Sequence, residues 1–479
     1  MKLHKILIVG IVLLTLQACA TDPVTGKRGF AMSESWEINA GKKYHQEILK
    51  QYTVYDDPEL QAYLNDIGQR MAKTSHRPDL PFTFTLLDSP EVNAFALPGG
   101  YVYVTRGIMA YMTKEAHLAG VVGHEIGHVT GRHGAERAVQ QQIAQVATVA
   151  VAVGTGSGEL MQASQMLGGA LMSGYGRKQE LESDRLGAQY IAQNNYSPDD
   201  MIGVISILKN QELFARQKAK EEGREYKGYH SLFSTHPRND QRLQEVISAA
   251  DKFRDLSKPE PDDGRFLRLT SNMAYGESEE QGITRGNKFY HKALNLYVEF
   301  PDGWRVQNGQ SVLGAVSPDG SQMIKMQMDS VAPPVDMSRF LSSKFQGFIP
   351  GSSIPTSEDQ ALAGAGTIVD QKTGAKMNYR AAMITRGKQA FIVTGLGKNS
   401  LPNETFFDTA QSIRKLKPSE IKLAEGRNIK LIKAQRGDTM AKLAQRSNLE
   451  KYAEEQLRLI NNLYPTGEPK VGDLVKIIE

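Results

Sequence analysis

The chain has 479 residues, of which 40% are hydrophobic and 23% are charged. This is the composition of a globular protein, and the length allows about three domains. The 57 lysine and arginine residues nearly balance the 53 aspartate and glutamate residues, which argues against nucleic acid as a partner.

Residues 1–18 have the pattern of a targeting segment. Lys2 and Lys5 give a basic start, Ile6 to Leu16 an apolar core, and Gln17-Ala18 an exit with a small residue. The apolar core is too short to span a bilayer as a stable anchor. Two interpretations stay open, a lipoprotein signal or an ordinary secretory signal.

The only cysteine, Cys19, directly follows this segment, and a lone cysteine cannot form an internal disulfide. The junction Leu16-Gln17-Ala18-Cys19 resembles a bacterial lipobox, in which the cysteine is lipidated. The resemblance implies that the protein is held to a membrane through Cys19. Ala20 at the next position implies sorting to the outer membrane, facing the periplasm.

Residues 30–80 carry apolar side chains at helical spacing and are expected to form scaffold helices. Residues 82–106 change to alternation with period two. They predict short strands at 82–86, 93–96 and 101–104, with Pro98-Gly99-Gly100 as a turn.

The sequence Gly123-His124-Glu125-Ile126-Gly127-His128 contains the pattern H-E-x-x-H after an apolar run that predicts a buried helix. Residues four apart share one face of a helix, so His124 and His128 can hold one metal ion together. Glu125 is rotated off that face and can act on the attacking water. The helix is expected to begin near Thr113 and to end near His133-Gly134. The additional imidazoles of His117 and His133 are interpreted as packing or surface residues.

Residues 138–176 are rich in alanine, valine, methionine and glycine, without charge from Gln140 to Gly158. No unbroken apolar run is long enough for a transmembrane helix. We expect a helical pair, which could be a lid or a client-binding surface, or could pack in the core.

A catalytic zinc ion needs three protein ligands and an open position. Glu180 and Asp184 lie four apart in a helical segment and therefore share a face. Glu180 can complete the ligand set, and Asp184 can accept the N–H of a ligand histidine. The alternative for such a segment is a solvated, charged helix face.

Four pieces, in this order, resemble the HtpX-like and BepA-like zinc metallopeptidases, which include the CAAX prenyl peptidases. These pieces are Asn93–Gly100, His124–His128, Glu180–Asp184 and Ser234–Pro237. Ser183 departs from the pattern, since the family usually has alanine there. The lack of multiple membrane spans resembles the periplasmic BepA branch.

The resemblance implies a gluzincin-like metalloendopeptidase with one Zn²⁺ per chain. Its metal ligands would be His124, His128 and Glu180, with Glu125 as the catalytic base and Asp184 in the second shell. His236 is implied beside the metal, where it can also occupy the open position and hold the enzyme idle, and Arg242 is implied as a nearby basic residue. The strand with Asn93, Ala94 and Phe95 is implied to pair with an extended substrate.

The expected function is cleavage of misfolded or stalled periplasmic and outer-membrane proteins. Unfolded or misassembled envelope proteins are therefore the expected partners. The alternatives are a periplasmic chaperone with an idle zinc site and a peptidoglycan-anchored scaffold lipoprotein.

The rest of the chain predicts further domains. Residues 261–283 include a polar, proline-rich linker, and 284–417 alternate in the manner of strands and end in a helix, with weak similarity to the PsbP-like fold. Residues 428–479 predict strand, helix, helix and strand and resemble a LysM module, which binds peptidoglycan. The alternative is a small domain with this fold and no glycan ligand.

The fold class expected is α+β and multidomain. It comprises a signal peptide at 1–18, a mainly helical zincin-type peptidase domain with a small sheet at 19–260, the linker at 261–283, an α+β domain at 284–417 and a βααβ module at 428–479.

Overall fold

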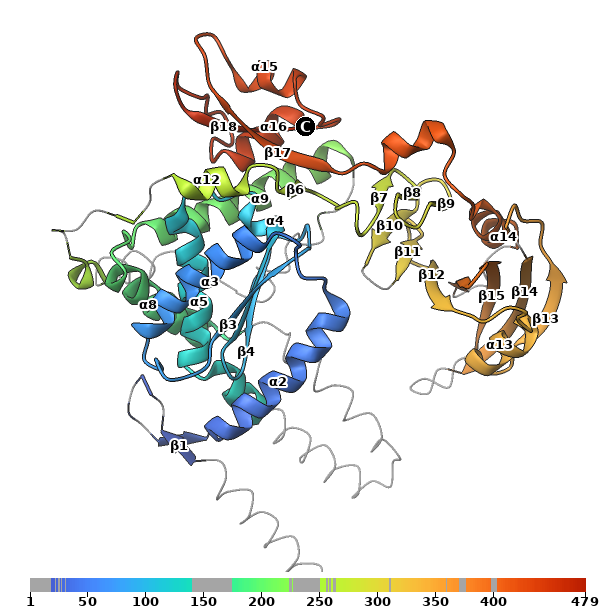
Figure 1. Ribbon diagram of the computed structural model, residues 1–479, viewed down its shortest axis with the longest axis horizontal. Helices are drawn as coiled ribbons and strands as arrows, with labels where there is room; N and C mark the ends of the chain where they lie inside the picture. Colours follow the sequence, from blue (N-terminus) through green and yellow to red (C-terminus); the bar gives the residue numbers. More distant parts are fainter. Residues whose placement is uncertain are drawn as a thin grey trace, which may run out of the picture. The chain divides into compact units, whose positions relative to one another are not determined.

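The computed structural model describes residues 19–139, 175–223, 226 and 250–479, except 22, 25, 27, 31, 256, 258–259, 262–263, 310–311, 359, 370–375 and 398–402. The chain forms two compact units. The first unit contains residues up to Tyr275 together with Asn428–Glu479, and the second unit contains Gly276–Arg427 (Figure 1). The α+β class agrees with the sequence prediction.

The first unit begins with a two-stranded hairpin and two amphipathic helices, as the spacing of 30–80 predicts. Both helices have side-chain N-caps, because Ser33 accepts the N–H of Trp36 and Asp57 accepts the N–H of Leu60. These elements are β1 (Cys19–Thr21), β2 (Arg28–Phe30), α2 (Glu34–Gln51) and α3 (Pro58–Lys73).

Three short strands follow within one residue of the predicted positions: β3 (Thr83–Leu87), β4 (Ala94–Leu97) and β5 (Tyr101–Thr105). Their order is β3-β5-β4, with β3 parallel to β5 and β4 antiparallel to β5. The β4–β5 turn needs φ values of +79° at Gly99 and +93° at Gly100, which glycine adopts without strain. Because the strand order is β3-β5-β4, strand β4 lies at an edge of the sheet.

Helix α5 spans Glu115–Thr130 and carries the H-E-x-x-H pattern. It is shorter than predicted at both ends. Lys114 occupies the N-cap position instead of Thr113, and the chain leaves the helix at Gly131 before a further helical stretch at 133–139. Helices α3, α5 and α8 (Arg177–Gln193) pack beside one another, and α9 (Asp200–Glu221) also covers α5 (Figure 1).

Residues 428–479 form the predicted βααβ arrangement, and their apolar side chains join the same core as α3 and α5. Within the expected linker, 265–270 form a helix whose Phe266 is fully buried in that core, and Met273 is buried there too. The structure thus assigns the segment up to Tyr275 to the first unit. The remaining elements of this unit are α4 (Arg106–Met109), η2 (Asp251–Phe253), α12 (Arg265–Thr270), β6 (Ala274–Tyr275), β17 (Arg427–Lys433), α15 (Met440–Gln445), α16 (Ala453–Ile460) and β18 (Leu474–Ile478).

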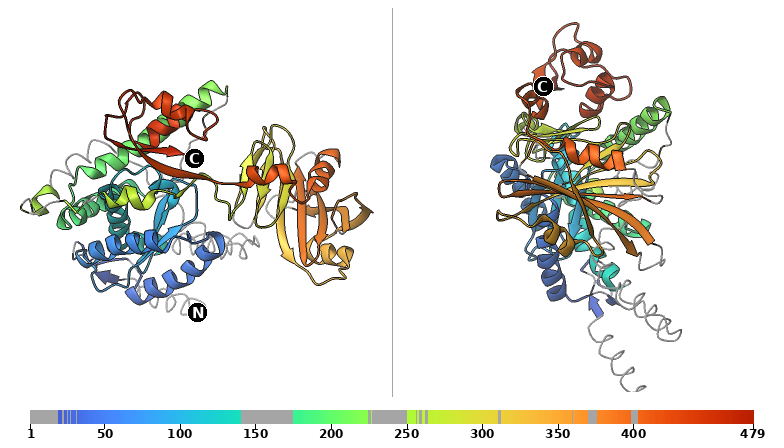
Figure 2. Two further views of the ribbon diagram at one scale, coloured as in Figure 1. Left: turned by 45° about the horizontal axis from the view of Figure 1, so that its top comes forward. Right: turned by 90° about the vertical axis from the view of Figure 1, so that its right-hand side faces the viewer.

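The second unit contains a three-stranded sheet and a seven-stranded sheet of order β10-β11-β12-β16-β15-β14-β13. Its strands fan out with the usual twist, which is clearest on the right of Figure 2. The elements are β7 (Ile283–Arg285), β8 (Lys288–His291), β9 (Leu296–Glu299), β10 (Arg305–Asn308), β11 (Leu313–Val316), β12 (Gln322–Ser330), α13 (Met337–Lys344), β13 (Ile349–Ser353), β14 (Gln360–Val369), β15 (Lys376–Arg386), β16 (Gln389–Gly397), α14 (Asn403–Ser412) and η3 (Pro418–Ala424).

Among the helices of the described residues, none combines the length and the apolar character needed to cross a membrane.

Candidate metal centre

Helix α5 presents two imidazoles on one face. Every residue of this helix except His124 is buried, because its composition is apolar almost all round. The Nε2 atoms of His124 and His128 lie 3.0 Å apart, as the spacing of four residues predicts. The two rings are nearly perpendicular, with an angle of 77° between their planes.

Helix α8 brings a carboxylate to the same point. The oxygens of Glu180 lie 3.6 Å from His124 Nε2 and 3.4 Å from His128 Nε2. One ligand atom from each of these three residues falls within 4.8 Å of the others. Two imidazole nitrogens and one carboxylate oxygen are a donor set that suits zinc, with a position left open for catalysis. The residues therefore fit the metal that the sequence predicts.

Glycines allow α5 and α8 to approach closely enough for this meeting. A Cβ atom at Gly127 would lie 2.9 Å from the carbonyl oxygen of Ser183, and a Cβ atom at Gly187 would lie 2.9 Å from the backbone nitrogen of His124. Both distances are too short for a side chain. The backbone contact between the helices thus depends on glycine at both positions.

Asp184 lies one turn after Glu180 and orients His124. The Nδ1–H of His124 donates to Asp184 Oδ1 at 2.9 Å, which leaves Nε2 directed at the cluster. Burial lowers the pKa of His124, but the hydrogen bond and charge of Asp184, with the charges of Glu180 and Glu125, raise it to about 9. Asp184 therefore lies where the sequence predicts a partner of a ligand histidine.

His133 holds the other ligand, and the sequence interpretation missed this role. The Nδ1 atoms of His128 and His133 are 2.9 Å apart. When Nε2 of His128 faces a metal, its Nδ1 carries the proton and donates to His133. His133 is buried, and its Nε2 lies 3.4 Å from Glu182.

Tyr175 is a second residue that the sequence did not indicate. Its ring stacks on His128 with a centroid distance of 3.8 Å, and the guanidinium carbon of Arg137 lies 3.9 Å from the centroid of the same tyrosine ring. Burial raises the pKa of the Tyr175 hydroxyl well above its usual range. Tyr175 therefore shields one face of a ligand imidazole.

Glu125 is 1% exposed, and its charge acts on the cluster. This carboxylate contributes to the raised pKa values of both His124 and Tyr175, for each of which burial is the largest influence. Glu125 lies on α5 one residue after His124, and its role as the catalytic base stays a prediction.

His117, by contrast, is a packing residue, as predicted. Its Nδ1 accepts the backbone N–H of Thr113 at 3.3 Å just before α5 begins. Burial is the main reason that the pKa of His117 is lowered to about 3, and the charges of Lys114 and Lys476 lower it further. The imidazole therefore stays neutral.

Of the residues predicted to bind substrate, Ala94 and Phe95 lie on the edge strand β4, and Asn93 directly precedes it. Asn93, Ala94 and Phe95 are buried, and the Phe95 ring stacks on Tyr103 at 4.7 Å. Their side chains thus pack in the protein, and only backbone groups of β4 are suited to pair with another strand. His236 and Arg242 lie outside the described residues. Cys19 lies in β1, but its side chain is outside the described part of the chain.

This arrangement of two histidines and a glutamate on α5 and α8 falls within one region of sequence similarity. Residues 58–250 match Peptidase family M48. The M48 peptidases are zinc-dependent, and the matched segment holds the whole cluster His124, His128 and Glu180. This part of the chain is therefore similar to M48 metallopeptidases.

Two relatives with curated names are also peptidases by name. The chain is 28% identical over 264 residues to the beta-barrel assembly-enhancing protease of Escherichia coli, which covers 53% of this chain and 52% of that protein. It is 28% identical over 229 residues to the mitochondrial metalloendopeptidase OMA1 of Schizosaccharomyces pombe, covering 47% and 64% respectively. The similarity thus spans about half the length of the Escherichia coli relative.

Proposed function

We propose that this protein is a zinc-dependent endopeptidase of the bacterial cell envelope that cleaves misfolded or stalled envelope proteins. The observation that carries the proposal is the cluster of His124, His128 and Glu180, with the buried carboxylate of Glu125 between the two histidines in sequence. The similarity to M48 peptidases supports the same reaction class.

The residues divide the work of peptide hydrolysis. His124, His128 and Glu180 would hold zinc, which when bound polarises the peptide carbonyl and activates water. Glu125 takes the proton of the attacking water and delivers it to the leaving amine. Asp184 and His133 hold the two imidazoles in orientation from outside, at 2.9 Å each. His236 and Arg242 remain candidates for stabilising the oxyanion.

The substrate class proposed is unfolded outer-membrane and periplasmic protein. Pairing of an extended chain with β4 would use backbone hydrogen bonds and so have little sequence preference. The position of β4 at the sheet edge supports this mode. The relative named a beta-barrel assembly-enhancing protease supports β-barrel proteins as the clients.

The proposed location is the periplasm, with a lipid anchor at Cys19 that holds the protein to the outer membrane. Residues 428–479 are proposed to contact peptidoglycan, which the predicted LysM resemblance and their βααβ order support. A pull-down of the full chain with purified peptidoglycan, with and without competing soluble glycan fragments, tests the contact with the wall. Metabolic labelling with a fatty acid, compared between the wild type and Cys19→Ser, tests the lipid anchor.

The test of the activity is cleavage of a urea-denatured outer-membrane β-barrel protein after dilution. Wild type should cut it, and Glu125→Gln should retain zinc but not cut. Glu47→Gln is a matched control, because this exposed carboxylate forms an ion pair with the surface Lys50 at 2.7 Å. Cleavage by Glu125→Gln would contradict the assignment of the base. Binding without cleavage by the wild type would favour a chaperone with an idle zinc site.

A further inference from the structure

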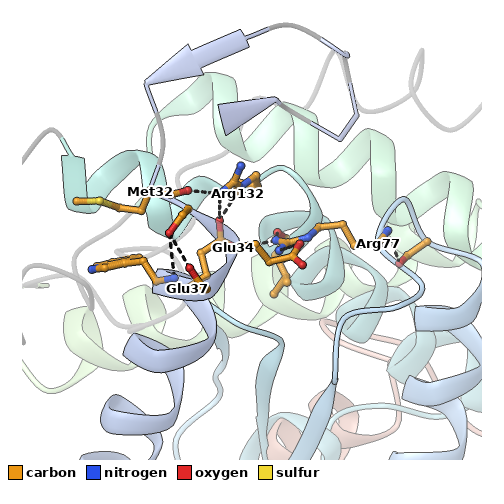
Figure 3. Close-up of polar contacts among 10 residues, drawn as sticks. Met32, Glu34, Glu37, Arg77 and Arg132 are labelled. Carbon is orange, nitrogen blue, oxygen red and sulfur yellow. Dashed lines mark hydrogen bonds and ion pairs between the residues drawn. The ribbon is translucent and has the colours of Figure 1, made fainter. Parts of the chain in front are cut away.

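A buried group of charges, formed by Glu37, Arg77 and Arg132, lies near the C-terminal end of α5 (Figure 3). Glu37 of α2 accepts hydrogen bonds from Arg77 at 2.6 Å and from Arg132 at 2.5 Å. The exposed fractions are 1% for Glu37, 7% for Arg77 and 8% for Arg132. One carboxylate thus joins two guanidinium groups in a dry environment, where losing one partner is costly.

Both arginines also donate to backbone carbonyl oxygens, one near the end of α5 and the other before α2. Arg77 donates to the carbonyl oxygen of Val129, the residue after His128, at 3.2 Å. Arg132 donates to the carbonyl oxygen of Met32, before α2. Arg77 further contacts Glu34 at 2.8 Å. Hydrogen bonds of Arg77 therefore connect the start of α2 to the last turn of α5.

The backbone at Arg132 has a conformation that a side chain rarely adopts. Its φ is +59°, and a left-handed residue other than glycine costs about 1–2 kcal/mol. This turn carries the chain back so that His133, the next residue, meets His128 Nδ1 at 2.9 Å. A Cβ atom at Gly131 would lie 2.6 Å from His133 Nε2, so a side chain there would displace the imidazole.

We propose that Glu37 and Arg132 are positioning residues for the metal ligand His128, and that they act through His133. Glu37 holds the Arg132 guanidinium, which keeps residue 132 in its turned conformation and sets the position of His133 against His128. Glu37 and Arg132 line the same small cavity as His128 and Tyr175. The charged residues and the metal ligand His128 therefore lie close to one another. The proposal rests on the proposed metal centre.

A comparable charge group at the other end of the same helix provides a control. Glu115 is 4% exposed and accepts hydrogen bonds from Tyr63 and Tyr196, and from Arg70 at 3.2 Å. Its removal should destabilise α5 as much as the removal of Glu37, but its hydrogen bonds go to Tyr63, Tyr196 and Arg70 and not to the turn at Arg132. A merely structural role of Glu37 would make the two variants alike.

The experiment measures zinc affinity by competition with a chromophoric chelator, together with the thermal unfolding midpoint, in the full chain. Glu37→Gln is expected to weaken zinc binding about tenfold or more, which is the usual effect of losing a supporting contact. Glu115→Gln should lower the unfolding midpoint and leave the zinc affinity within about twofold of wild type. Arg132→Gly keeps the turn accessible but removes the guanidinium, and it should also weaken zinc binding.

The outcomes separate this proposal from the proposed function. If the wild type binds no zinc, the metal centre itself is wrong. If the wild type binds zinc and both Glu37→Gln and Arg132→Gly match its affinity, the positioning role is wrong and the metal centre stands. Equal losses of affinity in Glu37→Gln and Glu115→Gln at equal unfolding midpoints would also overturn the positioning role.

Discussion

The Nδ1 atom of His124 and the carboxylate of Asp184 meet at 2.9 Å, although sixty positions of sequence separate them. The contact crosses from α5 to α8, the same two helices that bring Glu180 to the histidines. One helix thus supplies both a candidate ligand and the group that orients another ligand. The spacing of Glu180 and Asp184 by one helical turn makes this possible.

Asp184→Asn should weaken zinc binding by about 10–100-fold, because an amide is a poorer acceptor for the Nδ1–H of His124 and holds the ring less firmly. Chelator competition measures the effect. The control is Glu47→Gln, which changes an exposed carboxylate on α2 and should leave affinity unchanged. Unaltered affinity in Asp184→Asn would show that this contact does not support the metal centre.

Gly127→Ala should destabilise the protein by about 1–3 kcal/mol, the usual cost of overpacking a core. The new methyl group would lie 2.9 Å from the Ser183 carbonyl oxygen and would push α8 away, so zinc affinity should fall as well. Chemical denaturation and chelator competition measure the two effects.

Gly120→Ala is the matched control on the same helix, because its nearest neighbour would be Val204 Cγ2 at an ordinary 3.5 Å. Alanine is the better helix former by about 1 kcal/mol, so this variant should be at least as stable as wild type. If the two variants behaved alike, close packing of α5 on α8 would not explain the role of Gly127.

Lys476 should make the stability of the first unit depend on pH. It is fully buried, and its ammonium donates to the carbonyl oxygens of Ala110, at 2.9 Å, and Met112. Burial lowers its pKa from 10.5 to about 7. Between these two values the unfolded chain binds the proton and the folded protein does not, so the free energy of unfolding rises with pH.

From pH 7 to pH 9 this residue should add about 2 kcal/mol to the free energy of unfolding. Urea unfolding of the wild type and of Lys476→Met at both pH values measures the contribution, which should vanish in the variant. Lys430→Met removes an exposed lysine on the neighbouring strand and should keep the pH effect. An equal rise in Lys476→Met would assign the pH dependence to other groups.

Much of the candidate site could be predicted because it depends on local periodicity. The apolar run before His124 predicts a buried helix, and the spacing of His124 and His128 predicts one shared face. Glu180 and Asp184 followed from the same reasoning on a second helix. The βααβ order of 428–479 also agrees with the sequence prediction.

The rest depends on contacts that periodicity does not encode. The contact of His133 with His128 needs a left-handed arginine, and side chains other than glycine seldom take that conformation. Alternation predicts β3 and β5 as strands but not their parallel pairing. A lysine in the apolar strand Leu474–Ile478 gives no sign that carbonyl groups more than three hundred positions earlier enclose it.

The most direct measurement is zinc content together with X-ray absorption at the zinc edge, for the full chain reloaded with zinc and for Glu180→Ala. The metal centre described above predicts one zinc ion per chain, coordinated by two imidazoles and an oxygen ligand, with binding strongly weakened in Glu180→Ala. A wild type without zinc, a spectrum without imidazole scattering, or full retention of zinc by Glu180→Ala would contradict it.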